Sequence, residues 1–188
     1  MKNKFSILFT FCLMIFFAQS AKAQYEKGDI LINPGLSLGV IGYNYYGSGY
    51  SGFLPLTINA EYSINDKFSL GGYAGYYSRS YKSIDYRFTA LSFGARGTFH
   101  ASGLLNEVLD LNINEEKLDL YGTVILGVHT YNWNYGDNRT SSLYDNGTGL
   151  RLGTTIGARY FFTPKFGAFF EVGRGVFGFA DLGISFKL

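Results

Sequence analysis

The last ten residues of the 188-residue chain, 179–188, read FADLGISFKL. From position 180 onward its even positions are apolar, while its odd positions are polar or glycine. Strict alternation is typical of a β-strand with one apolar and one polar face. A strand at the end of a chain still has two edges to pair. Pairing with the first strand would solve this by closing the sheet into a barrel.

The first 23 residues have the three parts of a secretory signal peptide. Lys2 and Lys4 form a basic start, residues 5–18 form an almost unbroken apolar run, and residues 21–23 (AKA) form a cleavage site of the A-x-A type. The apolar run is too short to span a bilayer as a helix. We therefore predict a signal peptide over residues 1–23 and a single exported domain over residues 24–188.

The exported domain is rich in glycine and aromatic residues and poor in charge. The chain has 25 Gly, 16 Tyr and 18 Phe, and 16% of its residues are charged, against about 25% in an average soluble domain. Three of the 16 Lys and Arg lie in the signal peptide, which leaves 13 against 14 acidic residues, so the formal charge of +2 is no evidence for nucleic-acid binding. The one cysteine, Cys12, lies in the signal peptide, so the exported domain has no disulfide.

Alternating segments recur along the whole exported domain. They predict eight strands, over Ile30–Val40, Phe53–Ile64, Phe68–Tyr77, Arg87–His100, Leu118–Tyr131, Leu150–Phe162, Phe166–Gly173 and Phe179–Leu188. Residues 65–67 and 163–165 are short polar turns. The connection 101–117 is longer and carries apolar residues at helical spacing, so we expect a short amphipathic helix there, lying on the membrane surface.

Alternation by itself allows either a soluble barrel with an apolar interior or a membrane barrel with an apolar exterior. The apolar face of the predicted strands carries no charge, as lipid requires, since Arg or Lys at the bilayer midplane costs about 2–4 kcal/mol. The opposite face is crowded with Gly, Ser and Thr, which suits a narrow lumen. Aromatic residues near the short turns would form an interfacial girdle: Tyr62, Phe68, Phe99, Tyr160, Phe162, Phe166 and Phe186. The predicted fold class is all-β, an eight-stranded antiparallel up-and-down transmembrane β-barrel.

Inward-pointing charges are the first candidate functional feature. Glu61, Arg96, Arg159 and Glu171 would fall in one layer of the lumen, two of each sign. Buried charges persist only when paired, so we predict a salt-bridge network that seals a polar lumen. The residues that could extend it are Asp119, Arg151, Asp181 and Lys187. The alternative is a gate whose pairs exchange partners to open a narrow channel for ions or small solutes.

The outer loops are the second candidate. With both termini at the periplasmic end, residues 42–52, 78–86 and 132–149 and a minimal hairpin near 174–176 face outside. These loops are rich in Tyr, Gly, Ser and Asn, which make adaptable binding surfaces. The candidates for binding a surface ligand are Tyr43, Tyr45, Tyr46, Tyr50, Tyr81, Trp133, Tyr135 and Tyr144. The alternative is that these rings extend the girdle and brace the loops.

Enzymatic motifs are weak. His100 and Ser102 have the His-x-Ser spacing of an outer-membrane lipid A deacylase, but they lie at the periplasmic rim. His129 lies near the outer rim, where Asp137 with Ser141 or Ser142 would have to join it. Residues 173–178 match a dinucleotide-binding pattern in letters, but a strand follows them in place of the required helix. We predict no enzyme, no catalytic residue, no cofactor and no metal site.

From residue 28 to the C-terminus the chain resembles small eight-stranded outer-membrane proteins of the OmpX and OmpA-barrel type. Three segments resemble such proteins from Bacteroidetes: KGD at 27–29, GARYFF at 157–162 and FGAFFE at 166–171. The last strand is similar to the C-terminal assembly signal of such barrels through Asp181, Gly183, Phe186 and Leu188, with Leu where Phe is usual.

This resemblance implies an integral, monomeric protein of the outer membrane of a Gram-negative bacterium. It would be structural, or would interact with its surroundings through its outer loops. The implied partners are outer-membrane lipid and lipopolysaccharide, and, during insertion, periplasmic chaperones and the barrel assembly machinery. A nucleic-acid partner is not expected.

Overall fold

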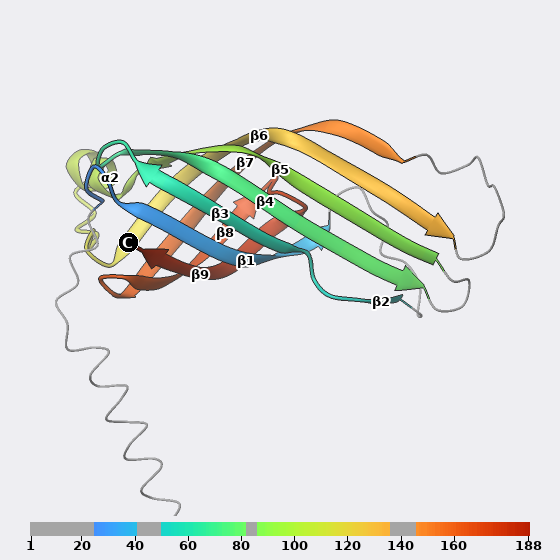
Figure 1. Cartoon of the computed structure of the whole chain (residues 1–188). Helices are drawn as coiled ribbons and strands as arrows, with labels where there is room; N and C mark the ends of the chain where they lie inside the picture. Colours follow the sequence, from blue (N-terminus) through green and yellow to red (C-terminus); the bar gives the residue numbers. More distant parts are fainter. Residues whose placement is uncertain (1–24, 41–49, 82–85, 136–145) are drawn as a thin grey trace, which may run out of the picture.

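The computed structural model describes residues 25–40, 50–81, 86–135 and 146–188, so the predicted signal peptide lies outside the described residues. The described elements are β1 (Ile30–Val40), β2 (Tyr50–Gly52), β3 (Leu56–Ser63), β4 (Phe68–Tyr81), β5 (Tyr86–His100), α2 (Ser102–Leu109), β6 (Leu118–Tyr135), β7 (Gly147–Thr163), β8 (Phe166–Gly173) and β9 (Gly178–Lys187). Figure 1 shows the strands wound into a barrel with α2 at one end.

The sheet closes on itself through its last strand, as predicted. The strand order is β2-β4-β3-β1-β9-β8-β7-β6-β5, and β4 also pairs with β5. β9 pairs antiparallel with β1 from Leu31↔Lys187 to Val40↔Gly178, and the Leu188 N–H donates to the Ile30 carbonyl at 2.9 Å. β2 and β3 are two parts of one wall segment, so the described residues form a closed eight-stranded antiparallel barrel.

The second predicted strand begins later than expected. Residues 53–55 are not in a strand, and the short β2 pairs with β4 beyond the start of β3. Pro55 explains the break because a proline has no N–H to donate to a strand ladder. The Pro55 carbonyl accepts a hydrogen bond from the Ser37 N–H at 2.9 Å, which keeps the chain beside β1.

Several strands are longer at their outer ends than predicted, β4 and β6 by the most. β4 and β6 end at Tyr81 and Tyr135 instead of Tyr77 and Tyr131, and Figure 1 shows them running with β5 past the neighbouring strands. Packed aromatic rings support this extension: the Phe88 and Trp133 rings lie 4.4 Å apart, centroid to centroid, with 52° between their planes. Cross-strand aromatic pairs of this kind stabilise sheets. Residues expected in outer loops therefore lie partly on strands.

The apolar face points outward and the mostly polar face points inward. Leu126 is 51% exposed and Ile156 is 67% exposed, whereas their neighbours Ile125 and Thr155 are buried. A soluble barrel with an apolar interior is therefore excluded. Along β9 one residue departs from the prediction: Ala180 is buried, because the alternation changes phase next to Phe179, whose ring lies over Gly39 in β1.

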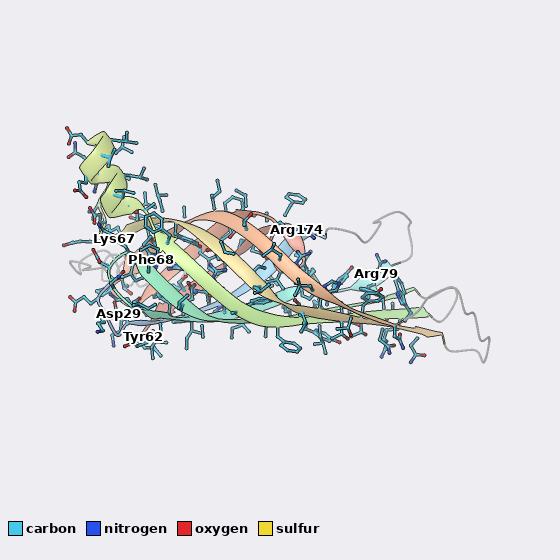
Figure 2. All side chains as sticks on the ribbon, turned by 90° about the horizontal axis from the view of Figure 1, so that it is seen from above. Asp29, Tyr62, Lys67, Phe68, Arg79 and Arg174 are labelled. Atoms are coloured by element: carbon cyan, nitrogen blue, oxygen red, sulfur yellow. The ribbon has the colours of Figure 1, made fainter. Side chains whose placement is uncertain are left out.

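The aromatic girdle forms at the end of the barrel that we predict to be periplasmic, which we call the periplasmic end. Phe68 and Phe99 have ring centroids 5.1 Å apart, and Phe166 and Phe186 are 5.5 Å apart. In Figure 2, Tyr62 and Phe68 lie at the same end of the barrel as Asp29 and Lys67, while Arg79 and Arg174 lie toward the other end. This girdle marks the level at which the barrel meets the periplasmic interface.

The predicted helix is present as α2, which ends at Asp110 in the left-handed conformation (φ 50°). The Asn106 side chain holds the returning chain, since its Nδ2 donates to the Ile113 carbonyl at 2.8 Å and its Oδ1 accepts from the Ile113 N–H at 2.6 Å. Figure 2 shows α2 projecting sideways from the end of the barrel. Among the described residues, no helix has the length and apolar character needed to cross a membrane.

Candidate functional site

The periplasmic half of the lumen contains a layer of charged side chains. The strand pleat brings five of them inward from five strands, and we call them the ion-pair layer: Glu61, Arg96, Asp119, Arg159 and Glu171. Arg96 bridges two carboxylates, with Nε 3.1 Å from Glu61 Oε1 and Nη2 2.6 Å from Glu171 Oε1. Arg159 bridges Asp119 at 3.2 Å and Glu61 at 3.7 Å. Alternating charges thus cross the lumen without interruption.

Neutral groups complete the ion-pair layer. The Tyr121 hydroxyl donates to Glu171 Oε1 at 2.9 Å, and the Thr155 hydroxyl donates to Glu171 Oε2 at 3.1 Å. The Arg159 guanidinium lies 4.7 Å from the centroid of the Tyr121 ring. These contacts replace water around buried charges, which is the condition under which such charges are tolerated.

Tyr25 closes the periplasmic mouth. Sequence reasoning missed this residue because it precedes every alternating segment. Its hydroxyl donates to Asp119 Oδ2 at 2.8 Å and accepts from Arg159 Nη1 at 2.5 Å. Burial raises the pKa of this hydroxyl well above its ordinary value, so it stays protonated at neutral pH. Its side chain also joins a buried cluster with Leu31 and Phe161. The first described residue of the chain is thus part of the barrel interior.

His100 contacts the residues that close the periplasmic mouth. Its Nε2 lies 2.7 Å from the Ser69 hydroxyl, and its Nδ1 lies 3.0 Å from Asp119 Oδ2. This order matches that of a nucleophile, a base and an orienting acid, but Ser69 is 1% exposed and the Tyr25 ring lies over the imidazole at 4.1 Å. The predicted partner Ser102 instead donates to the Leu118 carbonyl at 3.0 Å. A structural role fits this histidine better than a catalytic one.

His129, the other histidine, stacks on Tyr131 with 6.2 Å between ring centroids. Its suggested partners Asp137, Ser141 and Ser142 lie outside the described residues. Within the described part of the chain, no group of His, Cys, Asp and Glu could hold a metal ion.

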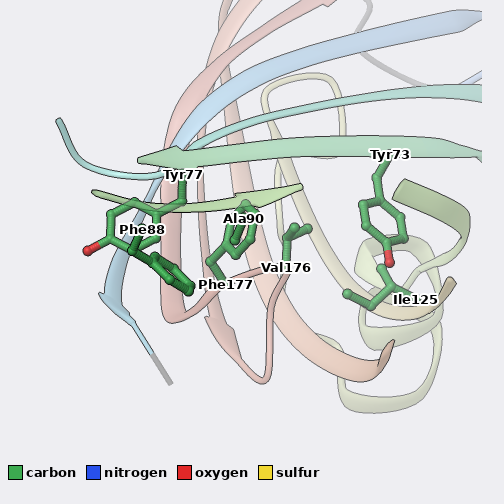
Figure 3. Packing of buried hydrophobic residues seen from close by; sticks show 7 residues of the cluster. All are labelled: Tyr73, Tyr77, Phe88, Ala90, Ile125, Val176 and Phe177. Atoms are coloured by element: carbon green, nitrogen blue, oxygen red, sulfur yellow. The ribbon is translucent and has the colours of Figure 1, made fainter. Parts of the chain in front are cut away.

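The outer half of the lumen is filled by the connection between β8 and β9, residues 174–177, which we call the plug loop. We expected a minimal outer hairpin here, but Val176 and Phe177 are 8% and 4% exposed and lie inside the barrel. They form a cluster with Tyr73, Tyr77, Phe88, Ala90 and Ile125, shown in Figure 3. The prediction of a wholly polar lumen is therefore wrong for its outer half.

Three of the predicted network residues serve other contacts. Arg151 donates from Nε to the Gly175 carbonyl of the plug loop at 3.1 Å, and Asp181 accepts a hydrogen bond from Ser37. Lys187 pairs with Asp29 at 3.0 Å near the periplasmic end. Arg151 and Asp181 thus support the outer half of the interior, while Lys187 ties the last strand to the segment before β1.

Little space remains between the two layers. A cavity of about 10 Å³ lies between Arg96, Glu171 and Val176, which is room for about one water molecule. A second cavity, of about 40 Å³, lies at the periplasmic mouth beside Tyr25 and His100. Neither of these two cavities could hold a solute larger than a few water molecules.

This closed barrel can now be compared with known proteins. Residues 9–185 match the family described as outer membrane protein beta-barrel domain. The chain belongs to this family. It has the eight-stranded architecture of the OmpX and OmpA-barrel type that its sequence resembles. The family points to the outer membrane of a Gram-negative bacterium. An origin in Bacteroidetes stays a prediction.

Several solved structures are similar to this barrel. The N-terminal β-barrel domain of Pseudomonas aeruginosa OprF has 16% identity and a TM-score of 0.44, covering 87% of this chain and 98% of that chain. OprG from Pseudomonas aeruginosa has 13% identity and a TM-score of 0.49, with 88% and 98% covered. Ail, the attachment invasion locus protein of Yersinia pestis, has 17% identity and a TM-score of 0.42, with 86% and 95% covered. No curated protein matches the sequence.

The outer binding candidates fall into three groups. Tyr43, Tyr45, Tyr46 and Tyr144 lie outside the described residues. Tyr50, Tyr81 and Tyr135 lie on strands, and the pairings Tyr50↔Tyr81, Tyr81↔Tyr86 and Tyr86↔Tyr135 place their Cα atoms in one row across the outer tip. Trp133 is partly buried and packs against the cluster that contains the plug loop.

Proposed function

We propose that this outer membrane β-barrel is a non-conducting, non-enzymatic integral protein, structural or surface-interacting through its outer end. One observation carries the proposal: the ion-pair layer fills the periplasmic half of the lumen, and the apolar cluster around the plug loop fills the outer half. An ion would have to displace the ion-pair layer, in which each arginine holds two carboxylates. It would then have to pass a mostly apolar cluster, where it would lose most of its hydration.

Conductance in planar bilayers tests this proposal. We expect the full-length purified protein to show no unitary current. The matched variant replaces Val176 and Phe177 by Gly and Arg96 by Ala, which removes side chains from both layers and should give a small, steady current. Unitary current from the unaltered protein would support the alternative, a narrow channel for ions or small solutes. Changed lipid A mass in cells that express the protein would instead support the lipid-modifying enzyme.

The outer tip is the part of the barrel that we propose meets a surface partner. The row of tyrosines across β2, β4, β5 and β6 supports this, since tyrosine gives a large contact area at low entropic cost. Replacing Tyr50, Tyr81 and Tyr135 by Ser should reduce attachment of whole cells to host or abiotic surfaces without changing barrel abundance. Unchanged attachment would favour a purely structural role.

We further propose that residues 1–23 are removed on export and that the mature barrel is a monomer in contact with outer-membrane lipid and lipopolysaccharide. Insertion would use periplasmic chaperones and the barrel assembly machinery, which would recognise the strand ending in Phe186 and Leu188. The position of Tyr25 supports the cleavage site, because a chain starting at Gln24 places this ring next to the barrel mouth. N-terminal sequencing of the outer-membrane form checks this, and a chain that begins elsewhere would contradict it.

A further inference from the structure

We propose that a groove on the outside of the barrel binds the acyl chain of a membrane lipid. The groove has a volume of about 400 Å³ and lies over β1, β3, β4 and β5. Its side-chain lining is apolar and comes from Pro34, Leu56, Ile58, Ala74, Tyr76 and Leu91. It is distinct from the lumen, because these residues lie on the outward face of their strands.

The sequence explains why the wall is hollow here. Ala74 is small, and Cα pairing places it between Ile58 on β3 and Phe93 on β5. Leu56, Tyr76 and Leu91 occupy one row of paired positions and are each about half exposed, so they stand up beside the hollow. β3 begins at Leu56 because of the break at Pro55, so regular wall stops at that edge of the groove.

The floor of the groove is backed from inside the barrel. A Cβ atom on Gly75 would lie 2.6 Å from the Phe177 ring and 2.8 Å from Val176 Cγ1, and one on Gly35 would lie 2.8 Å from the Phe169 ring. These inner side chains press against the wall where it carries glycine. The hollow therefore cannot close by moving inward, and it presents a preformed shape to the membrane.

Depth places the groove in the outer half of the membrane. On β4, Ala74 and Tyr76 lie six and eight residues beyond Phe68, which marks the periplasmic girdle. At about 3.3 Å per residue along tilted strands, that distance exceeds half of an apolar band about 25 Å tall. The groove is continuous with the lipid-facing surface, so the hydrocarbon of the outer leaflet is what meets it.

A second copy of the barrel is the competing occupant, and the physics of lipid disfavours it. Apolar protein surfaces gain no hydrophobic free energy by meeting each other in lipid, so association depends on close packing. A single flexible chain can follow the floor of the hollow, whereas the convex wall of another barrel would bridge its rim. The occupant we assign is therefore an acyl chain that exchanges more slowly than its neighbours in the bilayer.

Photocrosslinking tests the assignment with the full-length protein folded in phosphatidylethanolamine vesicles. A small fraction of the lipid carries a photoactivatable diazirine in its acyl chain, and labelled positions are mapped by peptide mass spectrometry. We expect labelling at Leu56, Tyr76 and Leu91 to exceed that at the equally exposed Leu126 by about threefold, as a few additional carbon–carbon contacts would give. Ala74→Phe fills the groove and should abolish this excess.

The matched control is Ala168→Phe, which adds the same ring on the outward face of β8, away from the groove and from Leu126, and should leave the labelling pattern unchanged. Ala74→Leu replaces Ala74→Phe if the larger side chain prevents folding. Uniform labelling of the outer surface would overturn the proposal, as would an excess that survives a folded Ala74 variant. Chemically crosslinked dimers joined through Tyr76 would also overturn it in favour of a second copy.

Discussion

At the scale of single residues, the arginines of the ion-pair layer each hold two acidic partners. Arg96 joins Glu61 to Glu171, and Arg159 joins Glu61 to Asp119. The planar guanidinium suits this bridging role because its donors point in several fixed directions. Removing one arginine therefore leaves two buried carboxylates short of a partner.

We expect Arg96→Met to lower the free energy of unfolding by about 3–5 kcal/mol, because breaking a buried pair leaves uncompensated charge. Urea unfolding of the protein in phospholipid vesicles, followed by tryptophan fluorescence, measures the change. The control is Arg87→Met on the same strand, where the arginine is exposed and the expected change is about 0.5 kcal/mol or less. Equal effects of the two substitutions would show that Arg96 does not hold the layer together.

At the scale of elements, the plug loop and the wall depend on each other. Gly75 on β4 has no side chain at the place where Val176 and Phe177 meet the wall. The plug loop is held from the other side by Arg151, whose guanidinium donates to Gly175. A connection between two strands thereby becomes part of the interior packing.

Gly75→Val should push the plug loop out of place and destabilise the barrel by about 1–3 kcal/mol, the usual cost of overpacking a filled interior. Urea unfolding measures this cost, and cleavage of the displaced loop by added protease in intact cells reports its exposure. Gly72→Ala is the control, since an added Cβ there would be 3.4 Å from its nearest neighbour, an ordinary contact. A fully stable, protease-resistant Gly75→Val protein would contradict the contact.

The helix α2 carries a separate prediction, that it lies on the periplasmic surface of the membrane. Val108 and Leu109 are 67% and 57% exposed, and an apolar face of this kind gains free energy at the interface. In a Trp133→Phe background, which removes the one tryptophan of the chain, Val108→Trp should fluoresce with a blue-shifted maximum and be quenched by lipids with brominated chains. Glu107→Trp, one position earlier, should be quenched less. Equal quenching of both would place α2 away from the bilayer.

At the scale of the whole molecule, the barrel separates a lipid-facing surface from a filled interior along every strand. Leu126 and Ile156 face outward, and their neighbours Ile125 and Thr155 face the packed lumen. The one cysteine of the chain, Cys12, lies in the predicted signal peptide, so each thiol inserted in the barrel is a specific probe of one face.

We expect Leu126→Cys and Ile156→Cys, in intact outer membranes, to react with a lipid-soluble probe and not with a water-soluble maleimide. Thr155→Cys should react with neither, because the ion-pair layer and the plug loop leave no water-filled path to it. Lys67→Cys, in the periplasmic turn, is the positive control for the water-soluble reagent once the membrane is opened. Maleimide labelling of Thr155→Cys before opening would mean that the lumen conducts water and small solutes.

The sequence alone determined the barrel, its closure by the last strand and the inward direction of Glu61, Arg96, Arg159 and Glu171. It could do so because a strand has a period of two, which assigns every residue to a face, and because lipid forbids charge on one of those faces. The positions of the girdle rings follow from the same rule.

What fills the barrel follows from three-dimensional packing and not from any local pattern. Tyr25 and the plug loop lie in segments without periodicity, and their places depend on Asp119, Arg159 and Gly75, which are distant in the sequence. Alternation shows which side chains face inward, but it does not show which of them form pairs. The contact of Arg151 with the plug loop could therefore not be predicted from the sequence. The groove at Ala74 depends on a strand break beside a small residue on the next strand. Such features arise from packing in three dimensions, which no local pattern encodes.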